Sequence, residues 1–244
     1  SIMINVTVHG AEGRMGLLVA DLIEQSQQLK LTALVTEPGK NQEKGTFHPE
    51  LPLIGQETMS DSIEDSGVII DFSLPSALDG LLSAASATNS MLVIGTTGYS
   101  DSQLQAIRDY ANNHAVVLAS NYSVGIPAIG SLIAKLAEIL PEGFMPELTE
   151  IHHQHKIDMP SGTAKTLVDK WSDSRSGEKV PTHSLRIGGV VGEHKLTISD
   201  DEETIEIIHR AHSRKTFLRG IIPAVKFVNG KQSGLFSMED VLAQ

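Results

Sequence analysis

The sequence predicts an α/β protein: a Rossmann-like, doubly wound parallel sheet followed by an α+β domain with a mixed sheet. Short apolar strands alternate with amphipathic helices over residues 4–119, and such alternation favours a parallel sheet with right-handed crossovers. A turn with the spacing Gly-x-x-Gly-x-x-Gly follows the first strand, at residues 10–16. After Gly125 the alternation ends, and one apolar helix precedes a group of strand-like runs.

The composition excludes several classes of function. The chain has 244 residues, 40% of them hydrophobic, and a formal net charge of −11, which argues against nucleic acid as a partner. It has no cysteine, so disulfides and thiolate chemistry are excluded. No apolar run approaches the roughly 18 residues of a membrane span. Because residues 3–6 run straight into a strand, we expect no secretory signal and a cytoplasmic location.

The first strand and helix have the context of a dinucleotide-binding fingerprint. Residues 4–8 are rich in β-branched side chains and predict a strand. Apolar residues then recur at helical spacing from Met15 to Ile23. Glycines between the two permit a tight turn and let backbone N–H groups approach a pyrophosphate. A purely structural glycine turn is the alternative.

The second strand is predicted at residues 31–35, and Thr36 and Glu37 follow it. In a Rossmann unit this position meets the adenosine ribose. A carboxylate at Glu37 would accept hydrogen bonds from the ribose hydroxyls and repel a 2′-phosphate, which favours NADH over NADPH. A glutamate in a surface turn is the alternative, and residues 39–50 are expected to form a loop.

Three further strand–helix patterns complete the first domain. The expected strands are 68–72, 91–94 and 116–119, and the expected helices are 76–88 and 101–113. Gly95-Thr96-Thr97-Gly98 and Ser120-Asn121-Tyr122-Ser123 come at the carboxyl ends of two of these strands, where cofactor-facing loops belong.

The second domain is expected to combine two helices with an antiparallel or mixed sheet. An apolar helix is predicted at residues 126–140, a strand through residues 150–153, a helix from Ala164 to Trp171 and a polar loop at 172–181. Three more strands are expected at 183–187, 195–199 and 204–209. A helix over residues 216–228 and a short one from Ser237 are expected to return to the first domain. The predicted boundaries are 1–122 with 214–244 for dinucleotide binding, and 123–213 for substrate binding and oligomerisation.

The stretch from Glu150 to Ala164 carries the densest chemistry. It contains three imidazoles and one ammonium, and Pro160-Ser161-Gly162-Thr163 then opens a helix. A helix start offers unpaired N–H groups and a partial positive charge, which suit an anion such as a carboxylate. We therefore expect an anionic small molecule here, beside proton donors.

Two other interpretations of this stretch need weighing. The histidines could form a solvated strand edge. They could also bind a metal through His152, His153 and His155. Neighbouring residues of a strand point to opposite faces, however, and the helical His-Glu-x-x-His spacing is absent. We therefore predict no metal.

Several motifs together resemble one family. They are Gly10-x-x-Gly13-Arg14-Met15-Gly16, Asp71-Phe72-Ser73, Gly95-Thr96-Thr97-Gly98, Asn121-Tyr122-Ser123-Val124-Gly125, His152-His153-x-x-Lys156-x-Asp158-x-Pro160-Ser161-Gly162-Thr163-Ala164, Val191-Gly192-Glu193-His194 and Ser233-Gly234-Leu235-Phe236. In this order, and nearly end to end, they are similar to the dihydrodipicolinate reductases of diaminopimelate and lysine biosynthesis.

The resemblance implies reduction of a cyclic dicarboxylate by NADH or NADPH in a homotetramer built through the sheet of the second domain. It implies that His152 is an acid/base group, that Lys156 is a proton donor, and that His153 and the helix start at Ser161, Gly162 and Thr163 bind substrate. The residues that match cofactor contacts are Gly10, Ala11, Glu12, Gly13, Arg14, Met15, Gly95, Thr96, Thr97, Ala119, Ser120, Asn121 and Tyr122.

The chemistry of the residues agrees with this resemblance. Hydride added to a conjugated ring leaves electron density that must be protonated, and a positioned cation or acid stabilises that charge. Lys156 is a compact ammonium donor, and His152 titrates near neutral pH. The alternatives from other classes are a non-catalytic dinucleotide sensor, which needs neither residue, and a metal-assisted hydrolase using the three imidazoles.

Overall fold

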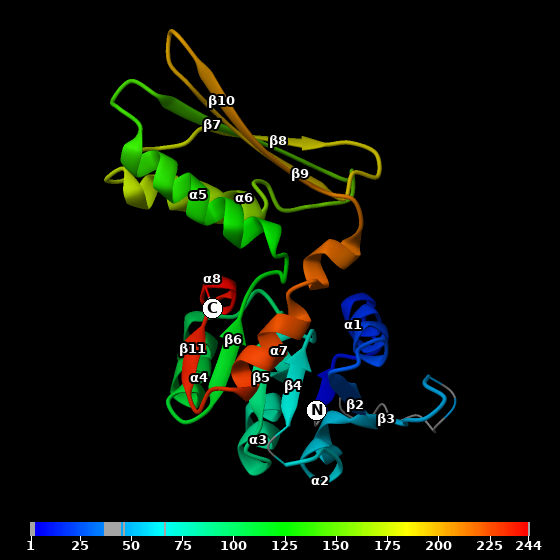
Figure 1. The fold of residues 1–244 in the computed structure, drawn as a ribbon. Helices are drawn as coiled ribbons and strands as arrows, with labels where there is room; N and C mark the ends of the chain where they lie inside the picture. Colours follow the sequence, from blue (N-terminus) through cyan, green and yellow to red (C-terminus); the bar gives the residue numbers. More distant parts are fainter. Residues whose placement is uncertain (1–2, 37–44, 46, 66, 244) are drawn as a thin grey trace. The chain divides into compact units, whose positions relative to one another are not determined.

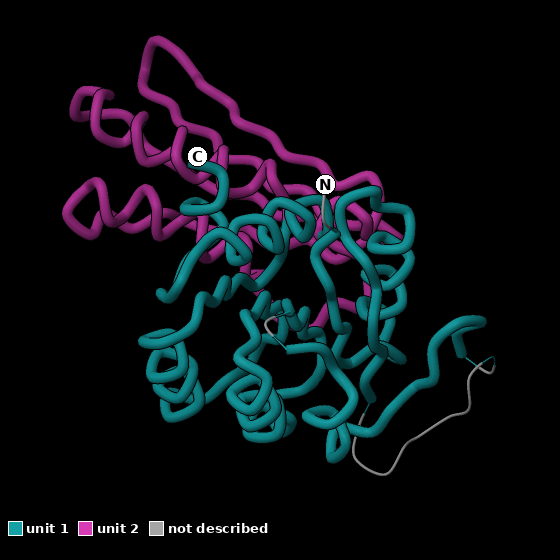
Figure 2. The backbone as a smooth tube through the Cα atoms, turned by 60° about the horizontal axis from the view of Figure 1, so that its bottom comes forward, with its two compact units in different colours: residues 1–122, 218–244 teal, residues 123–217 magenta. Residues whose placement is uncertain are grey.

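The computed structural model describes residues 3–36, 45, 47–65 and 67–243. They divide into two compact units, Ser1–Tyr122 with Leu218–Gln244, and Ser123–Phe217 (Figure 2). The chain therefore leaves the first unit once and returns to it near its end. The functional assignment of residues 1–122 and 214–244 to cofactor binding, and of 123–213 to substrate binding, stays a prediction.

The first unit is built on a seven-stranded sheet in which every described strand pair is parallel (Figure 1). In spatial order its strands are β11 (Gly234–Phe236), β6 (Ala115–Leu118), β5 (Met91–Ile94), β4 (Val68–Asp71), β1 (Ile4–His9), β2 (Leu29–Thr36) and β3 (Leu53–Gly55). The strand order reverses at β1, which has β4 on one side and β2 on the other. This arrangement confirms the predicted doubly wound fold.

Helices cover both faces of this sheet because its strands are apolar on both faces. Ile70 and Val93 belong to one core with α1 and α7, whereas Ile69 and Leu92 belong to a second core with α3 and α4. Continuous apolar runs are what buried parallel strands require. The helices of this unit are α1 (Arg14–Glu24), η1 (Gln56–Thr58), α2 (Met59–Ser62), η2 (Pro75–Ala77), α3 (Leu78–Ala87), α4 (Asp101–Ala111), α7 (Ile221–Asn229) and α8 (Met238–Leu242).

The prediction of one helix over residues 216–228 was wrong. The chain forms the short helix η3 (Arg214–Leu218), turns, and only then starts α7. At the turn the backbone N–H of Gly220 donates to the Tyr122 carbonyl at 2.7 Å. A Cβ on Gly220 would lie 2.7 Å from that oxygen, so this close approach requires glycine. The sequence prediction also missed four short elements, β3, η1, α2 and β11.

The second unit is a four-stranded mixed sheet with two helices, as predicted. Its spatial order is β10 (Thr204–Ala211), β9 (Gly192–Ser199), β7 (Met145–His152) and β8 (Thr182–Arg186). The β7–β8 pair is parallel, and the other two pairs are antiparallel. Helices α5 (Gly125–Ile139) and α6 (Gly162–Ser174) lie side by side on one face (Figure 1). Because α6 extends to Ser174, the loop predicted at 172–181 starts later than expected.

Alternation along these strands divides the second sheet into an apolar part and a polar part. Leu148, Leu196 and Ile198 are buried and form a core with the helices. Further along the same face, Glu150 and His152 follow at two-residue steps, so the sheet itself brings polar groups beneath the start of α6.

Among the described residues, no helix is long and apolar enough to cross a membrane.

Candidate active site

The glycine turn after β1 is bonded to the end of β2. The N–H groups of Gly10 and Ala11 both donate to the Val35 carbonyl, at 2.9 and 3.0 Å. Gly10 has φ +76°, a conformation that favours glycine. A Cβ on Gly16 would lie 2.1 Å from the Gly10 carbonyl oxygen, so the start of α1 packs directly on the turn. Strand, turn and helix thus have the geometry predicted for the fingerprint.

A cavity of about 600 Å³ opens beside this turn, at the carboxyl ends of the strands where the strand order reverses. In open parallel α/β sheets, ligands bind in this crevice. The cavity is lined by His9, Gly10, Glu12, Gly13, Thr36, Gln56, Phe72, Ser73, Leu74, Ser76 and Ala77.

Four predicted cofactor residues line the cavity: Gly10, Glu12, Gly13 and Thr36. The buried hydroxyl of Thr36 has no hydrogen-bond partner among the described residues. Glu37, on which the expected preference for NADH depends, lies outside the described residues. The other predicted residues do not line the cavity; these are Ala11, Arg14, Met15, Gly95, Thr96, Thr97, Ala119, Ser120, Asn121 and Tyr122.

The side chain of Tyr122 belongs to the core of the first unit. It is fully buried, and its hydroxyl donates to the carbonyls of Ile94 and Val117. Its side chain is therefore already committed to joining β5 and β6. The residues that line the cavity but were not predicted are His9, Gln56, Phe72, Ser73, Leu74, Ser76 and Ala77. Of these, only Phe72 and Ser73 had a signal in the sequence, the family motif Asp71-Phe72-Ser73.

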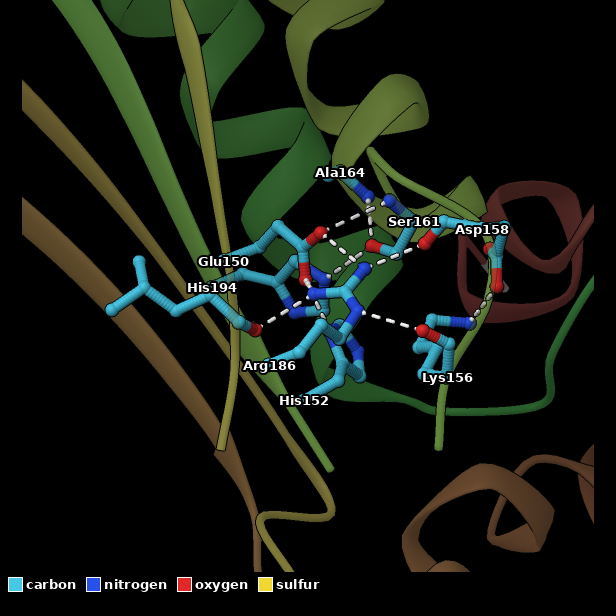
Figure 3. A network of polar contacts seen from close by, with 9 residues as sticks. Glu150, His152, Lys156, Asp158, Ser161, Ala164, Arg186 and His194 are labelled. Carbon is cyan, nitrogen blue, oxygen red and sulfur yellow. Dashed lines mark hydrogen bonds and ion pairs between the residues drawn. The ribbon is translucent and has the colours of Figure 1, made fainter. Parts of the chain in front are cut away.

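In the second unit, a buried carboxylate collects the polar side chains around it (Figure 3). Glu150 is fully buried on β7 and accepts two hydrogen bonds from the Arg186 guanidinium, at 2.8 and 2.9 Å. Its Oε2 also contacts Nδ1 of His152, and its Oε1 accepts from the Ser161 backbone N–H at 3.3 Å. Glu150 therefore connects β7, β8 and the start of α6.

Arg186 also fastens the loop that carries Lys156. Its Nε donates to the Lys156 carbonyl at 3.1 Å, and its Nη2 donates to the Asp158 carbonyl at 2.6 Å. The Lys156 ammonium in turn donates to the Asp158 carboxylate at 2.7 Å. The pKa of Asp158 is lowered, first by the hydrogen bond from Lys156 and also by the backbone N–H of Gly162. A carboxylate is thus held by the ammonium and the helix start together.

The start of α6 lies where the sequence predicts it. Ser161 is the N-cap, and its hydroxyl accepts from the Ala164 N–H at 3.1 Å. The same hydroxyl lies 3.0 Å from Nε2 of His194, a buried residue of β9. The ring of His194 stands edge-on to that of His152, with centroids 5.1 Å apart. The sequence prediction assigned no role to His194 or Arg186, although His194 ends one of the family motifs.

The charges and burial in this cluster fix the protonation state of the His152 imidazole. Burial alone would raise the pKa of Glu150, but the hydrogen bonds from Arg186, Ser184 and His152 lower it to about 2. Burial lowers the pKa of His152, against the opposing effect of Glu150. The stable arrangement near pH 7 is therefore a neutral imidazole whose Nδ1–H donates to a charged Glu150, which leaves Nε2 as the proton acceptor.

A metal fits this cluster poorly. Among the described residues, Glu150, His152 and His194 have potential ligand atoms within 4.8 Å of one another. However, both oxygens of Glu150 are already bonded to the Arg186 guanidinium. A divalent cation would have to share that carboxylate with a permanent positive charge, so the donor set favours the ion pair.

The other residues predicted to bind substrate are His153, Gly162 and Thr163, which are close in sequence to the residues of this cluster. His153 follows β7 and is half-buried, and its ring centroid lies 6.4 Å from that of His155. Gly162 is exposed at the first position of α6, followed by Thr163. The structure thus brings together His152, Lys156 and Ser161 through Glu150 and Arg186, with the exposed helix start beside them.

Comparisons with known sequences match both halves of the chain to one family. The model for the N-terminus of dihydrodipicolinate reductase matches residues 4–122, and the model for its C-terminus matches residues 125–242. The chain is 35% identical over 263 residues to 4-hydroxy-tetrahydrodipicolinate reductase of Nitrosomonas europaea. It is 37% identical over 259 residues to the protein of that name from Akkermansia muciniphila. Each match covers 98% of both chains.

Solved structures agree on the fold. Dipicolinate-bound dihydrodipicolinate reductase from Paenisporosarcina sp. TG-14 superimposes with a TM-score of 0.82 at 22% identity, covering 98% of this chain and 99% of that one. A myo-inositol dehydrogenase from Corynebacterium glutamicum matches less well, with a TM-score of 0.62 at 14% identity over 99% of this chain and 93% of that one. With both halves of the chain matched by its models, this protein belongs to the dihydrodipicolinate reductase family.

Proposed function

We propose that this protein reduces 4-hydroxy-tetrahydrodipicolinate to tetrahydrodipicolinate with a nicotinamide cofactor, in diaminopimelate and lysine biosynthesis. The net reaction consumes one hydride and one proton and releases water. The observation that carries the proposal is the cluster of His152, Lys156 and the α6 start, in a chain that belongs to this family. When bound, the nicotinamide supplies the hydride, and the protein supplies the proton and the binding of the ring.

The proposed roles follow from the contacts of each residue. The Lys156 ammonium and the N-terminus of α6 already hold the carboxylate of Asp158, so the same groups suit a carboxylate of the substrate. Lys156 is also the proposed proton donor, since an ammonium both stabilises developing negative charge and carries a proton. His152 is the proposed acid/base group, held in one tautomer by Glu150.

The proposed cofactor site is the cavity at the strand-order reversal in the first unit. Among the described residues, its lining includes the acidic Glu12 and no lysine or arginine. Together with Glu37 in the sequence, this favours NADH over NADPH, because a 2′-phosphate needs a positive partner. The measurement is kcat/KM for both cofactors with the same substrate, and we expect the larger value for NADH. A strong preference for NADPH contradicts this proposal.

We further propose a homotetramer assembled through the open face of the second sheet. Helices α5 and α6 cover one face (Figure 1), and no other described element of the second unit covers the opposite one. That face carries large apolar side chains, among them Leu185 and Ile208, which are 44% and 39% exposed. Exposed apolar surface of this kind is typical of interfaces. The cytoplasmic location that the composition favours stays a prediction.

The decisive experiment is NADH oxidation with and without the enzymatically generated ring substrate. Lys156→Ala should lower kcat by about a hundredfold or more, as expected for loss of a proton donor, while NADH still binds. Lys165→Ala, an exposed lysine on α6, is the matched control and should keep its activity.

The same assay separates the alternatives. A dinucleotide sensor would show no ring-dependent oxidation, and its NADH binding would be the same with or without Lys156. A metal-assisted hydrolase would lose activity on exhaustive chelation, whereas the proposed reductase keeps it. Full activity of Lys156→Ala would remove this residue from the mechanism.

A further inference from the structure

A second buried carboxylate, Asp71, organises the cofactor cavity in the first unit. It ends β4, and its register partner on β1 is His9. These two strands flank the point where the strand order reverses, which is where ligands bind in sheets of this kind. Both side chains are almost completely buried, at 0% and 1% exposure. The sequence analysis gave neither residue a functional role.

Four donors surround the Asp71 carboxylate, and they come from the end of β1 and from the loops that follow β4 and β5. Nδ1 of His9 lies 2.8 Å from Oδ1, and the Ser73 hydroxyl donates to the same oxygen at 2.5 Å. The hydroxyls of Thr96 and Tyr99 donate to Oδ2, at 2.7 and 3.2 Å. The carboxylate thus joins the end of β1 to the loops that follow β4 and β5.

These hydrogen bonds keep Asp71 charged in the interior. Burial acts to raise its pKa, but the hydrogen bond from His9, with further bonds from Ser73 and Thr96, lowers it overall. A buried carboxylate without such donors would be strongly destabilising. The end of β1 and the two loops are therefore held together by a charge that their donors stabilise.

His9 carries the network on to two more segments. Its Nε2 lies 3.1 Å from Nε2 of Gln56, and that amide also donates to the Ala77 carbonyl at 2.7 Å. Because the Gln56 amide is a donor here, Nε2 of His9 is the acceptor and Nδ1 carries the hydrogen bonded to Asp71. His9, Gln56 and Ala77 all line the cavity.

We propose that His9 and Asp71 are positioning residues that set the affinity of the cavity for the dinucleotide. The proposal rests on the proposed use of this cavity for a nicotinamide cofactor. Ser73 and Gln56 of the cavity lining bond directly to this pair, and Ala77 is joined to it through Gln56. Binding groups held by such supporting hydrogen bonds lose less freedom when a ligand binds. The pair need not touch the cofactor, since it acts through the loops it holds.

The first test is NADH titration, without substrate, of variants of His9. His9→Ala should raise the Kd for NADH about tenfold. His9→Asn keeps an amide donor where Nδ1 bonds to Asp71 and should restore the Kd to within about threefold of the unmodified protein. At saturating NADH, kcat should change by less than about threefold, because the reacting groups are untouched.

His48→Ala is the matched control. His48 is also buried in the first unit, at 8% exposure, and its Nε2 is paired with Glu24 at 2.7 Å, but it does not line the cavity. It should lower the melting temperature without changing the Kd for NADH. If His9→Ala likewise leaves the Kd within about twofold of the unmodified protein, the proposed role is wrong.

A pair of milder variants keeps the proposal testable if His9→Ala does not fold. His9→Asn and Gln56→Ala both break the link between His9 and Gln56, so each should raise the Kd by about threefold and the double variant should add nothing further. Effects that multiply in the double variant would overturn the proposal. If the unmodified protein binds NADH without reducing the ring, the proposed function fails but the proposed role of His9 stands. If all His9 variants show normal turnover and unchanged NADH binding, the proposed role of His9 fails but the proposed function stands.

Discussion

Two buried carboxylates have the same task in different units. Glu150 and Asp71 each lie near the carboxyl end of a strand, and each is bonded to an imidazole. Both keep a pKa below the ordinary value despite burial, because several donors converge on them. A single ionised residue can therefore fix the positions of groups that come from several strands and loops.

His194 makes the stability of the second unit depend on pH. Burial is the main cause that lowers its pKa from 6.5 to about 4. Between these values the unfolded chain binds more protons than the folded protein, so stability falls as the pH drops from 6.5 to 4. The shift corresponds to about 3 kcal/mol.

The free energy of unfolding of the unmodified protein should fall by about 3 kcal/mol from this residue between pH 6.5 and 4. We expect His194→Gln to abolish most of that fall. The measurement is urea unfolding between pH 4 and 7, followed by the fluorescence of Trp171, the only tryptophan, which is buried in this unit. His183→Gln replaces an imidazole that is 55% exposed and serves as the control. An unchanged pH dependence in His194→Gln would contradict this assignment.

At the scale of elements, glycines in helices have different physical roles. Gly16 lies in α1, where a Cβ would meet the Gly10 carbonyl oxygen at 2.1 Å. Gly130 lies in α5, where a Cβ would make ordinary contacts of 3.5 Å or more with the Lys170 side chain. Only the first glycine is required by close packing of backbone on backbone.

Gly16→Ala should therefore lower the free energy of unfolding by about 2 kcal/mol or more and weaken NADH binding at least about tenfold. Gly130→Ala should be neutral or stabilising by up to about 1 kcal/mol, since alanine favours helix more than glycine. Circular dichroism during thermal unfolding and NADH titration measure the two effects. If Gly16→Ala is as stable as Gly130→Ala and binds NADH as tightly, the glycine turn after β1 can relax and the prediction is wrong.

Element prediction was accurate where local pattern decides the structure. The helix start near Ser161 and the apolar face of α1 were predicted because their signals lie within a few residues. The three-residue strand β11 was missed because its pairing with β6 joins segments more than a hundred residues apart. The tail helix was mispredicted because its interruption depends on the contact between Gly220 and Tyr122.

For the assembled protein, the open face of the second sheet is the proposed contact surface between subunits. Leu185→Glu and Ile208→Glu place charges on that face, and we expect either one to shift the protein from tetramer to smaller species, because a buried unpaired charge is costly. Light scattering coupled to size exclusion measures the mass. Leu132→Glu on α5, where the leucine is 49% exposed, is the control and should leave the mass unchanged. A monomeric unmodified protein would refute the proposed tetramer.

The order of the residues was enough to predict the fold class, the position of the glycine turn, the start of α6 and the stretch that holds His152 and Lys156. These depend on periodicity, helix starts and glycine spacing, which act between residues close in the chain. The folded structure was needed to find that Arg186 bonds to Glu150 and His194 packs on His152, and that His9 bonds to both Asp71 and Gln56. Strand pairing joins segments tens of residues apart, and local pattern does not specify which side chains then become neighbours.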